Sequence, residues 1–209
     1  MVSKAEIFGR LYFCGFKVVD DMEIGNRLFF IAQKVKMPSY QTNPTYGPIV
    51  QLKRIGFNDR MINVYKFRTM YPYSAFLQEY IYQQNDLNTG GKFNHDFRVT
   101  DWGKFMRATW LDELPMIYNW LKGDLKFFSV RPISHQYLSL YTDELRKLRT
   151  TVLPGQIPPF YADMPKTLPE IIESELRYIK SYLKAPVKTQ LRYLWHSSIN
   201  IIFRGARSN

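Results

Sequence analysis

The segment that most limits the fold of this chain is residues 49–70, IVQLKRIGFNDRMINVYKFRTM. Two runs rich in β-branched and aromatic residues flank GFNDR, whose glycine, asparagine and aspartate are typical of a tight turn. The segment therefore predicts an antiparallel β-hairpin. Its basic positions are Lys53, Arg54, Arg60, Lys66 and Arg68. Because helical patterns surround it, we expect the fold class α+β, a small antiparallel β-hairpin or sheet packed with several helices.

Apolar residues at helical spacing indicate where those helices lie. A short amphipathic helix is expected in NRLFFIAQKVK, residues 26–36, from the spacing of Leu28, Ile31, Ala32 and Val35. Residues 74–84 and 134–148 also have a helical pattern. The last part, 167–204, holds two helical patterns divided near Pro186. We expect basic amphipathic helices there, because tyrosines and a tryptophan alternate with basic residues: Arg177, Lys180, Lys184, Lys188, Arg192, Arg204 and Arg207.

Other segments carry turn and loop chemistry. Residues 37–48, rich in proline, glycine, asparagine and tyrosine, are typical of a linker. Residues 85–96 predict a polar, glycine-containing loop with His95 in solvent. LKFFSV, residues 125–130, favours a strand. LPGQIPPFYADMP, residues 153–165, has too many prolines for a regular helix or strand, and we expect it to be irregular.

Length and charge limit the possible functions. The 209 residues fit one domain with an appendage, which we divide into an N-terminal segment 1–45 and a domain 46–209. The 29 Lys and Arg against 18 Asp and Glu give a net charge of +11. The expected partner is anionic: a nucleic acid, a phosphorylated metabolite or an anionic membrane surface. One cysteine excludes an internal disulfide framework, and no run of about 18 apolar residues predicts a membrane-spanning helix.

Asp112 and Glu113 stand side by side in RATWLDELPMIYN, an otherwise apolar run. Thr109 is the expected N-cap of a helix, which places both carboxylates in its first turn, where the helix dipole favours negative charge. Capping is therefore one interpretation of the pair. The other is catalytic, since a carboxylate among aliphatic residues beside an arginine can act as a nucleophile, a metal ligand or a base.

Three motifs in order set this pair in a wider context: VYKFRTM, RVTDWGKFMRATWLDELPMIYNWLKGDL and VRP. Together they resemble the signature of the bacterial sugar transferases, the monotopic polyprenyl-phosphate phosphoglycosyl transferases that begin surface glycan assembly. The resemblance runs from about residue 46 to the end. Residues 1–45 stand where that family has an apolar membrane-inserted helix. Either the chain is a divergent member, or the membrane segment lies outside this sequence.

The resemblance implies a two-step transfer of a sugar 1-phosphate from a UDP-sugar to polyprenyl (undecaprenyl) phosphate. By that resemblance Asp112 is the nucleophile and a ligand of Mg²⁺, the expected cofactor, and Glu113 is its partner. The implied contacts to phosphate or nucleotide are Arg107, Arg131, Lys66 and Arg68. Local alternatives remain open: Arg107 as a structural ion pair, Lys66 and Arg68 on a solvated strand face, and Arg131 as a helix cap.

Two further interpretations compete with the enzyme. Val130 in SVRP stands where the resembled family usually has a proline, which leaves a catalytically impaired member, regulatory or scaffolding, as the alternative function. A nucleic-acid-binding protein would suit the net charge, but no nucleic-acid module is visible, so we expect no nucleic acid as partner. For the enzyme, the expected location is the cytoplasmic face of the bacterial inner membrane.

Overall fold

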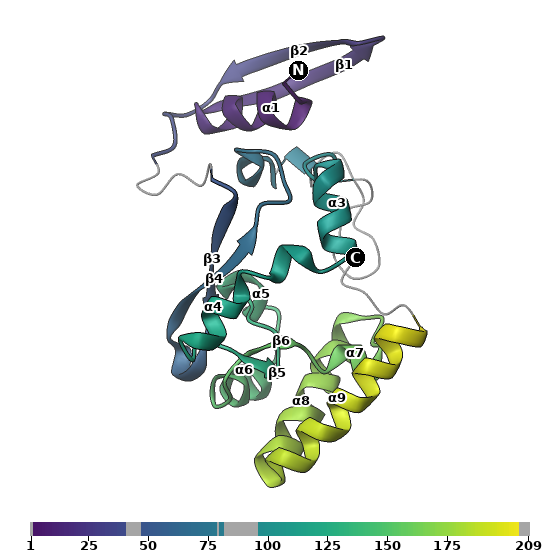
Figure 1. Ribbon diagram of the computed structural model, residues 1–209. Coiled ribbons are helices and arrows are strands. Elements are labelled where there is room, and N and C mark those ends of the chain that lie inside the picture. Colours follow the sequence, from purple (N-terminus) through teal and green to yellow (C-terminus); the bar gives the residue numbers. More distant parts are fainter. Residues whose placement is uncertain (1, 41–46, 79, 82–95, 205–209) are drawn as a thin grey trace. The chain divides into compact units, whose positions relative to one another are not determined.

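The computed structural model describes residues 2–40, 47–78, 80–81 and 96–204 (Figure 1). The chain forms two compact units. Unit 1 comprises Met1–Pro48 and Arg68–Thr109, and unit 2 comprises Ile49–Phe67 and Trp110–Asn209. The expected boundary between residues 45 and 46 lies outside the described residues. Helices combine with small sheets in both units, which confirms the α+β class.

Unit 1 is built on a helix and a β-hairpin. Helix α1 (Lys4–Phe13) precedes strands β1 (Phe16–Ile24) and β2 (Arg27–Lys34), which pair antiparallel. The 3₁₀ turn η2 (Ser74–Leu77) packs against α1 and completes this core. The buried residues of the core are Ala5, Phe8, Tyr12, Val18, Leu77, Tyr80 and Ile81. Helix α3 (Asp101–Ala108) belongs to the same unit and begins at the N-cap Thr100.

The helix expected over residues 26–36 is wrong, because this segment forms β2. Its sequence fits both periods, and the alternating residues Leu28, Phe30 and Ala32 share the face of the hairpin on which the Phe30 ring lies 5.5 Å from the Phe8 ring of α1. Gly25, at φ +59°, supplies the tight turn into β2. Cross-strand hydrogen bonding to β1 then decides for a strand.

Unit 2 contains the β-hairpin predicted over residues 49–70. Strands β3 (Ile49–Ile55) and β4 (Met61–Phe67) pair antiparallel from Ile49↔Phe67 to Ile55↔Met61, which confirms that prediction. The 3₁₀ turn η1 (Phe57–Asp59) joins them. Asn58 and Asp59 adopt positive φ values of 52° and 58°. Asn and Asp tolerate this left-handed conformation better than most residues, so the turn chemistry read from GFNDR is the one the chain uses.

A parallel pair of short strands joins two distant parts of unit 2. Strand β5 (Lys126–Phe128) confirms the expected strand, and it pairs with β6 (Gly155–Ile157). The irregular segment expected over 153–165 is thus wrong, since it holds β6 and helix α7 (Phe160–Asp163). A Cβ at Gly155 would lie 2.4 Å from Ser129 N, so only glycine permits this pairing. Prolines precede α7, where their missing N–H groups cost no helical hydrogen bond.

Helices surround these strands. The 3₁₀ turn η3 (Leu111–Glu113) leads into α4 (Met116–Leu121), and Gly123, at φ +74°, follows the end of α4. The helix expected over 134–148 is two helices, α5 (His135–Leu138) and α6 (Asp143–Thr150). The C-terminal pair is α8 (Leu168–Lys184) and α9 (Pro186–Phe203), divided at Pro186 as predicted.

The core of unit 2 lies between β5, α6, α8 and α9. Its largest buried aromatic group joins Phe128 of β5, Tyr178 of α8 and Tyr193 of α9, with ring centroids 5.1–6.1 Å apart. Figure 1 shows α8 and α9 lying side by side. In the part of the chain that the structure describes, no helix combines the length and hydropathy needed to cross a membrane.

Two sequence predictions fall partly or wholly on residues that are not described. Of the helical segment 74–84, η2 and the helical residues Gln78, Tyr80 and Ile81 are described, and residues 79 and 82–84 are not. The loop 85–96, with His95, lies outside the described residues apart from Asp96.

Candidate active site

The backbone that carries Asp112 and Glu113 differs from the expected helix cap. Thr109 is the C-cap of α3, and the two acids lie in η3 instead of the first turn of an α-helix. Trp110, immediately before η3, has φ 60°, a left-handed conformation that is an outlier for a bulky residue. Its ring packs against that of Tyr161, 5.4 Å away. The expected helix-capping geometry is therefore wrong.

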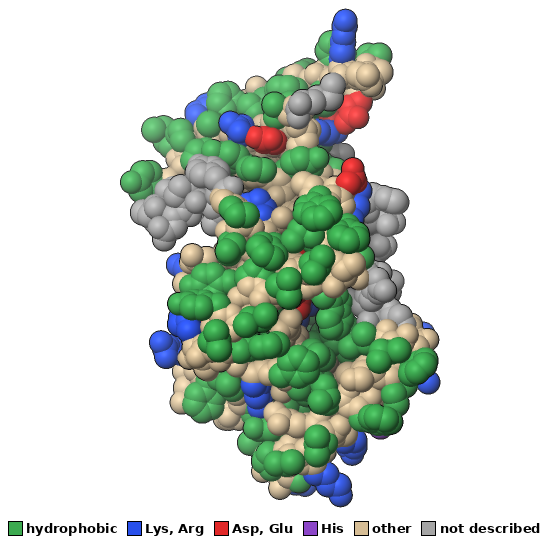
Figure 2. Space-filling model, viewed as in Figure 1, with side chains coloured by type: hydrophobic (Ala, Val, Ile, Leu, Met, Phe, Trp, Pro, Cys, Tyr) green, Lys and Arg blue, Asp and Glu red, His purple; other side chains and the backbone are tan. Residues whose placement is uncertain are grey.

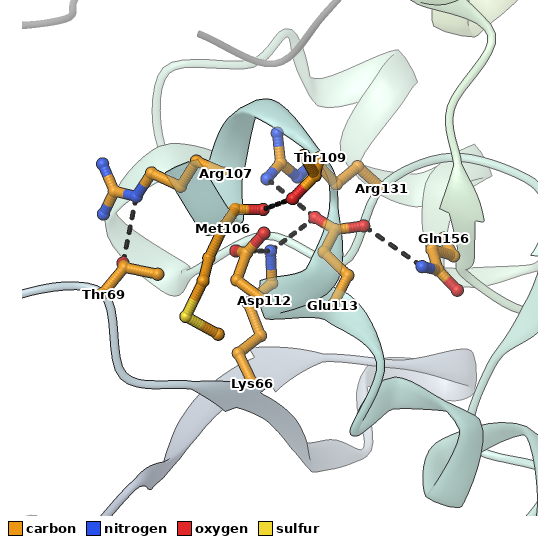
Figure 3. Close-up of polar contacts among 9 residues, drawn as sticks. All are labelled: Lys66, Thr69, Met106, Arg107, Thr109, Asp112, Glu113, Arg131 and Gln156. Carbon is orange, nitrogen blue, oxygen red and sulfur yellow. Dashed lines mark hydrogen bonds and ion pairs between the residues drawn. The ribbon is translucent and has the colours of Figure 1, made fainter. Parts of the chain in front are cut away.

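Glu113 is held by side chains from three separate segments of unit 2 (Figure 3). Lys66 of β4 donates from Nζ to Oε1 at 2.5 Å. Gln156 of β6 donates from Nε2 to Oε2 at 3.2 Å. Arg131, which follows β5, has Nη2 3.9 Å from Oε1. Both carboxylate oxygens of Glu113 are thus engaged by donors that fix its orientation.

Asp112 shares one of these cations. Its Oδ2 lies 3.8 Å from Lys66 Nζ, so Lys66 forms ion pairs with both acids of the dyad. Asp112 is buried, with 8% of its surface exposed. Figure 3 shows Lys66 of β4 pointing toward both acids of η3, with Arg131 reaching Glu113 from another segment. The cluster joins two carboxylates with two cations, Lys66 and Arg131, and both kinds of cation bind phosphate groups.

The cluster shifts the ionisation of its members. Burial alone raises the pKa of Glu113, but Lys66, Arg131 and the Gln156 hydrogen bond together outweigh it and hold the pKa below its ordinary value. Burial also lowers the pKa of Lys66, against the opposing field of Glu113. Glu113 is therefore ionised at neutral pH, where it acts as an acceptor and not as an acid.

The structure brings four of the six residues expected from sequence into one cluster: Lys66, Asp112, Glu113 and Arg131. The solvated-face alternative is wrong for Lys66, whose side chain is 16% exposed and paired. Arg107 and Arg68 belong to unit 1. There Arg107 Nε donates to Thr69 Oγ1 at 3.0 Å, and Arg68 Nε donates to the backbone oxygen of Gly47 at 2.8 Å.

Two supporting groups were missed from the sequence. Gln156 lies in the segment expected to be irregular, and no local pattern marks it as a site residue, since it meets Glu113 only through the pairing of β5 with β6. Asn119 of α4 accepts from the backbone N–H of Tyr65 at 3.1 Å and donates to the backbone oxygen of Asn63 at 2.7 Å. Fully buried, it ties α4 to β4 next to Lys66.

A buried ion pair holds the backbone of Arg131 in place. The guanidinium of Arg149 in α6 donates both to the carboxylate of Glu175 in α8 and to the backbone oxygen of Arg131. Arg149 and Glu175 are 6% and 2% exposed. The pair therefore fixes the backbone from which Arg131 extends toward Glu113.

The carboxylates of the cluster are potential ligands of Mg²⁺. In the part of the chain that the structure describes, no group of three or more His, Cys, Asp and Glu side chains forms a metal cage. Mg²⁺ is commonly held by only one or two carboxylates, with substrate phosphates and water completing an octahedron. The Asp112 carboxylate in η3 fits that mode of binding as a single protein ligand, whereas both oxygens of Glu113 are already engaged by donors.

The chain is similar to a known protein family and to several known proteins. The family model described as bacterial sugar transferase matches residues 28–203. Galactosyl transferase CpsE of Streptococcus agalactiae serotype III is 37% identical over 112 residues, 52% of this chain and 24% of the relative. Undecaprenyl-phosphate galactose phosphotransferase of Salmonella typhimurium is 34% identical over 114 residues, 51% of this chain and 24% of the relative.

A third relative covers more of the chain. The UDP-N-acetylgalactosamine-undecaprenyl-phosphate N-acetylgalactosaminephosphotransferase of Aeromonas hydrophila is 32% identical over 146 residues, 65% of this chain and 32% of the relative. In each of these three cases the match spans between 24% and 32% of the relative's length.

Proposed function

Since the chain belongs to the bacterial sugar transferase family, we propose that it moves a sugar 1-phosphate from a UDP-sugar to polyprenyl phosphate, the first step of glycan assembly. The observation that carries the proposal is the Asp112–Glu113 dyad, whose two carboxylates share the Lys66 ammonium. The names of two of these relatives, the undecaprenyl-phosphate galactose phosphotransferase of Salmonella typhimurium and the N-acetylgalactosaminephosphotransferase of Aeromonas hydrophila, support the same reaction.

In this proposal Asp112 is the nucleophile. A carboxylate oxygen attacks the β-phosphorus of the UDP-sugar, the bond from that phosphorus to the bridging oxygen breaks, and UMP leaves. The sugar phosphate is then held on Asp112 as an acyl phosphate. An oxygen of polyprenyl phosphate attacks the same phosphorus and releases the aspartate. Phosphoryl transfer needs positioning and charge neutralisation above all, which a preorganised cluster supplies.

Each neighbour of Asp112 has a proposed role. Glu113 fixes Lys66, so that the ammonium lies beside both Asp112 and the incoming phosphate. Arg131, whose side chain is 38% exposed, is proposed to bind a phosphate with its planar guanidinium in bidentate geometry. On the matching family motifs, Arg107 and Arg68 are proposed as further contacts to phosphate or nucleotide.

Magnesium is the proposed cofactor. Asp112 is the residue that would hold it, and when bound it would shield the diphosphate charge against an anionic nucleophile. We place the reaction at the cytoplasmic face of a bacterial inner membrane, because polyprenyl phosphate is a membrane lipid. An anionic membrane surface is then the expected partner of this strongly basic chain.

The experiment that tests the proposal is UMP release from a panel of UDP-sugars with Mg²⁺, polyprenyl phosphate and detergent. Wild type is expected to release UMP with at least one donor, and Asp112→Asn is expected to release none, because an amide is a poor nucleophile. Lys147→Gln, at an exposed position on α6, is the control and should match wild type. Equal release by wild type and Asp112→Asn would remove Asp112 from the nucleophile role.

A further inference from the structure

Helix α9 has a largely polar inner face that fixes its orientation in unit 2. Its buried residues are Thr189, Tyr193, Ser197 and Asn200. Asn200 Nδ2 donates to the backbone oxygens of Tyr161 and Ala162 at 2.9 and 3.0 Å, and Thr189 Oγ1 donates to that of Ser181 at 3.0 Å. Because these bonds tie α9 to α7 and α8, the opposite face of the helix is turned permanently outward.

That outward face is apolar, the reverse of an ordinary surface helix. The α9 outer stripe is defined as Val187, Leu191, Trp195 and Ile202, which are 71%, 63%, 68% and 71% exposed. Their spacing of four, four and seven residues aligns them along one side of the helix. Figure 2 shows hydrophobic side chains gathered over the region of α9. An apolar stripe of this length, left exposed, marks an interaction surface.

The charges beside the stripe have one sign. Helix α9 contains Lys188 and Arg192, both exposed, and no Asp or Glu. Each follows a stripe residue by one position, so both lie along the same flank of the stripe. Lys184 at the end of α8 and Arg204 at the end of α9 extend the acid-free segment at both ends. The surface therefore combines exposed apolar groups with uncompensated positive charge.

We propose that the α9 outer stripe, with Lys188 and Arg192, lies flat on an anionic lipid surface. A helix with Trp and aliphatic residues on one side and Lys or Arg beside them lies in the interface, with its apolar side chains among the lipid chains and its cations at the phosphates. The proposal rests on the proposed function, whose acceptor is a lipid. A lipid surface is the occupant that fits, because a helix with only positive charges beside its apolar stripe complements the phosphates of an anionic membrane.

The test is sedimentation of the full chain with vesicles of phosphatidylglycerol and phosphatidylcholine in equal parts, against vesicles of phosphatidylcholine alone. Wild type is expected to bind the anionic vesicles more tightly. Each basic residue near an anionic surface contributes about fivefold in affinity, so Lys188→Gln/Arg192→Gln should lower it about 25-fold at low salt. Leu191→Ser/Trp195→Ser should abolish binding. The matched controls, Lys147→Gln/Lys166→Gln on exposed lysines of unit 2 and Leu140→Ser, should bind as wild type does.

Each outcome separates this proposal from the proposed function. All the variants are checked for folding by circular dichroism. Anionic-vesicle binding that is lost only in the two α9 double variants supports the proposal, whether or not UMP is released. Equal binding by wild type and the α9 double variants overturns it. The proposal is also overturned if wild type releases UMP in detergent but binds no vesicle. It is overturned as well if wild type binds no vesicle and light scattering shows a dimer that is lost in Leu191→Ser/Trp195→Ser.

Discussion

Replacing Lys66 with methionine removes the cation between the two carboxylates of the dyad. Lys66 Nζ lies 2.5 Å from Glu113 Oε1 and 3.8 Å from Asp112 Oδ2. Removing one partner of a buried ion pair destabilises a protein by about 3–5 kcal/mol. The two side chains keep 16% and 15% exposure and Arg131 remains 3.9 Å away, so we expect about 2–3 kcal/mol here. For a chain of this size the Tm should fall by about 4–12 °C.

The loss should depend on pH with a definite sign. Burial raises the pKa of Glu113, but in wild type Lys66 and Arg131 outweigh burial and the pKa lies below its ordinary value. Ionised Glu113 therefore contributes stability above its unfolded pKa, and that stability is lost as the pH falls through the folded pKa. In Lys66→Met burial prevails and the pKa of Glu113 rises. The deficit of the variant is then largest at neutral pH and shrinks in acid.

Thermal unfolding followed by circular dichroism at about pH 7 and about pH 4.5 measures both effects. Lys147→Met, on an exposed lysine of α6, is the control and should leave the Tm almost unchanged. Lys66→Met/Glu113→Leu should recover part of the loss, because it removes the Glu113 carboxylate together with the cation that pairs with it. A Tm within about 2 °C of wild type at neutral pH, or a deficit that grows in acid, would refute the reasoning.

Two further predictions concern the scaffold of the cluster. Gly155→Ala places a Cβ 2.4 Å from Ser129 N and should separate β5 from β6. The Tm should fall by several degrees, and UMP release should be slower because Gln156 of β6 is displaced. The control Gly47→Ala, with no atom within 4 Å of the added Cβ, should change neither the Tm nor UMP release. Asn119→Ala removes the buried amide that binds the Tyr65 N–H and the Asn63 backbone oxygen of β4, and each lost hydrogen bond should lower the unfolding free energy measured in urea by about 1 kcal/mol. An unchanged urea midpoint for Asn119→Ala would contradict that role.

Local chemistry explains what the sequence predicted correctly. The hairpin β3–β4 follows from GFNDR, whose own residues tolerate the left-handed turn, and the division of α8 from α9 follows from Pro186, which cannot continue a helix. Both features depend on residues within a few positions of one another. The pair Asp112–Glu113 was also found, because the motif around it is contiguous.

Long-range contacts explain what the sequence did not predict. Residues 26–36 fit a helix and a strand alike, and only pairing with β1 selects β2. Trp110 is not a residue type that predicts a turn, yet its backbone is left-handed. As a result Asp112 and Glu113 lie in η3 and not in the first turn of an α-helix. Gln156 and Arg149 become important only when folding brings them to Glu113 and Arg131, 43 and 18 positions away in the sequence.

The central claim, that Asp112 carries the phosphosugar, is tested most directly in the absence of any lipid acceptor. With a UDP-sugar donor and Mg²⁺, wild type should release a single burst of UMP close to one equivalent per chain. Mass spectrometry of the digested protein should then locate a sugar phosphate on the peptide that contains Asp112. A burst in Asp112→Asn equal to that of wild type, or an adduct on a peptide without Asp112, would contradict the account.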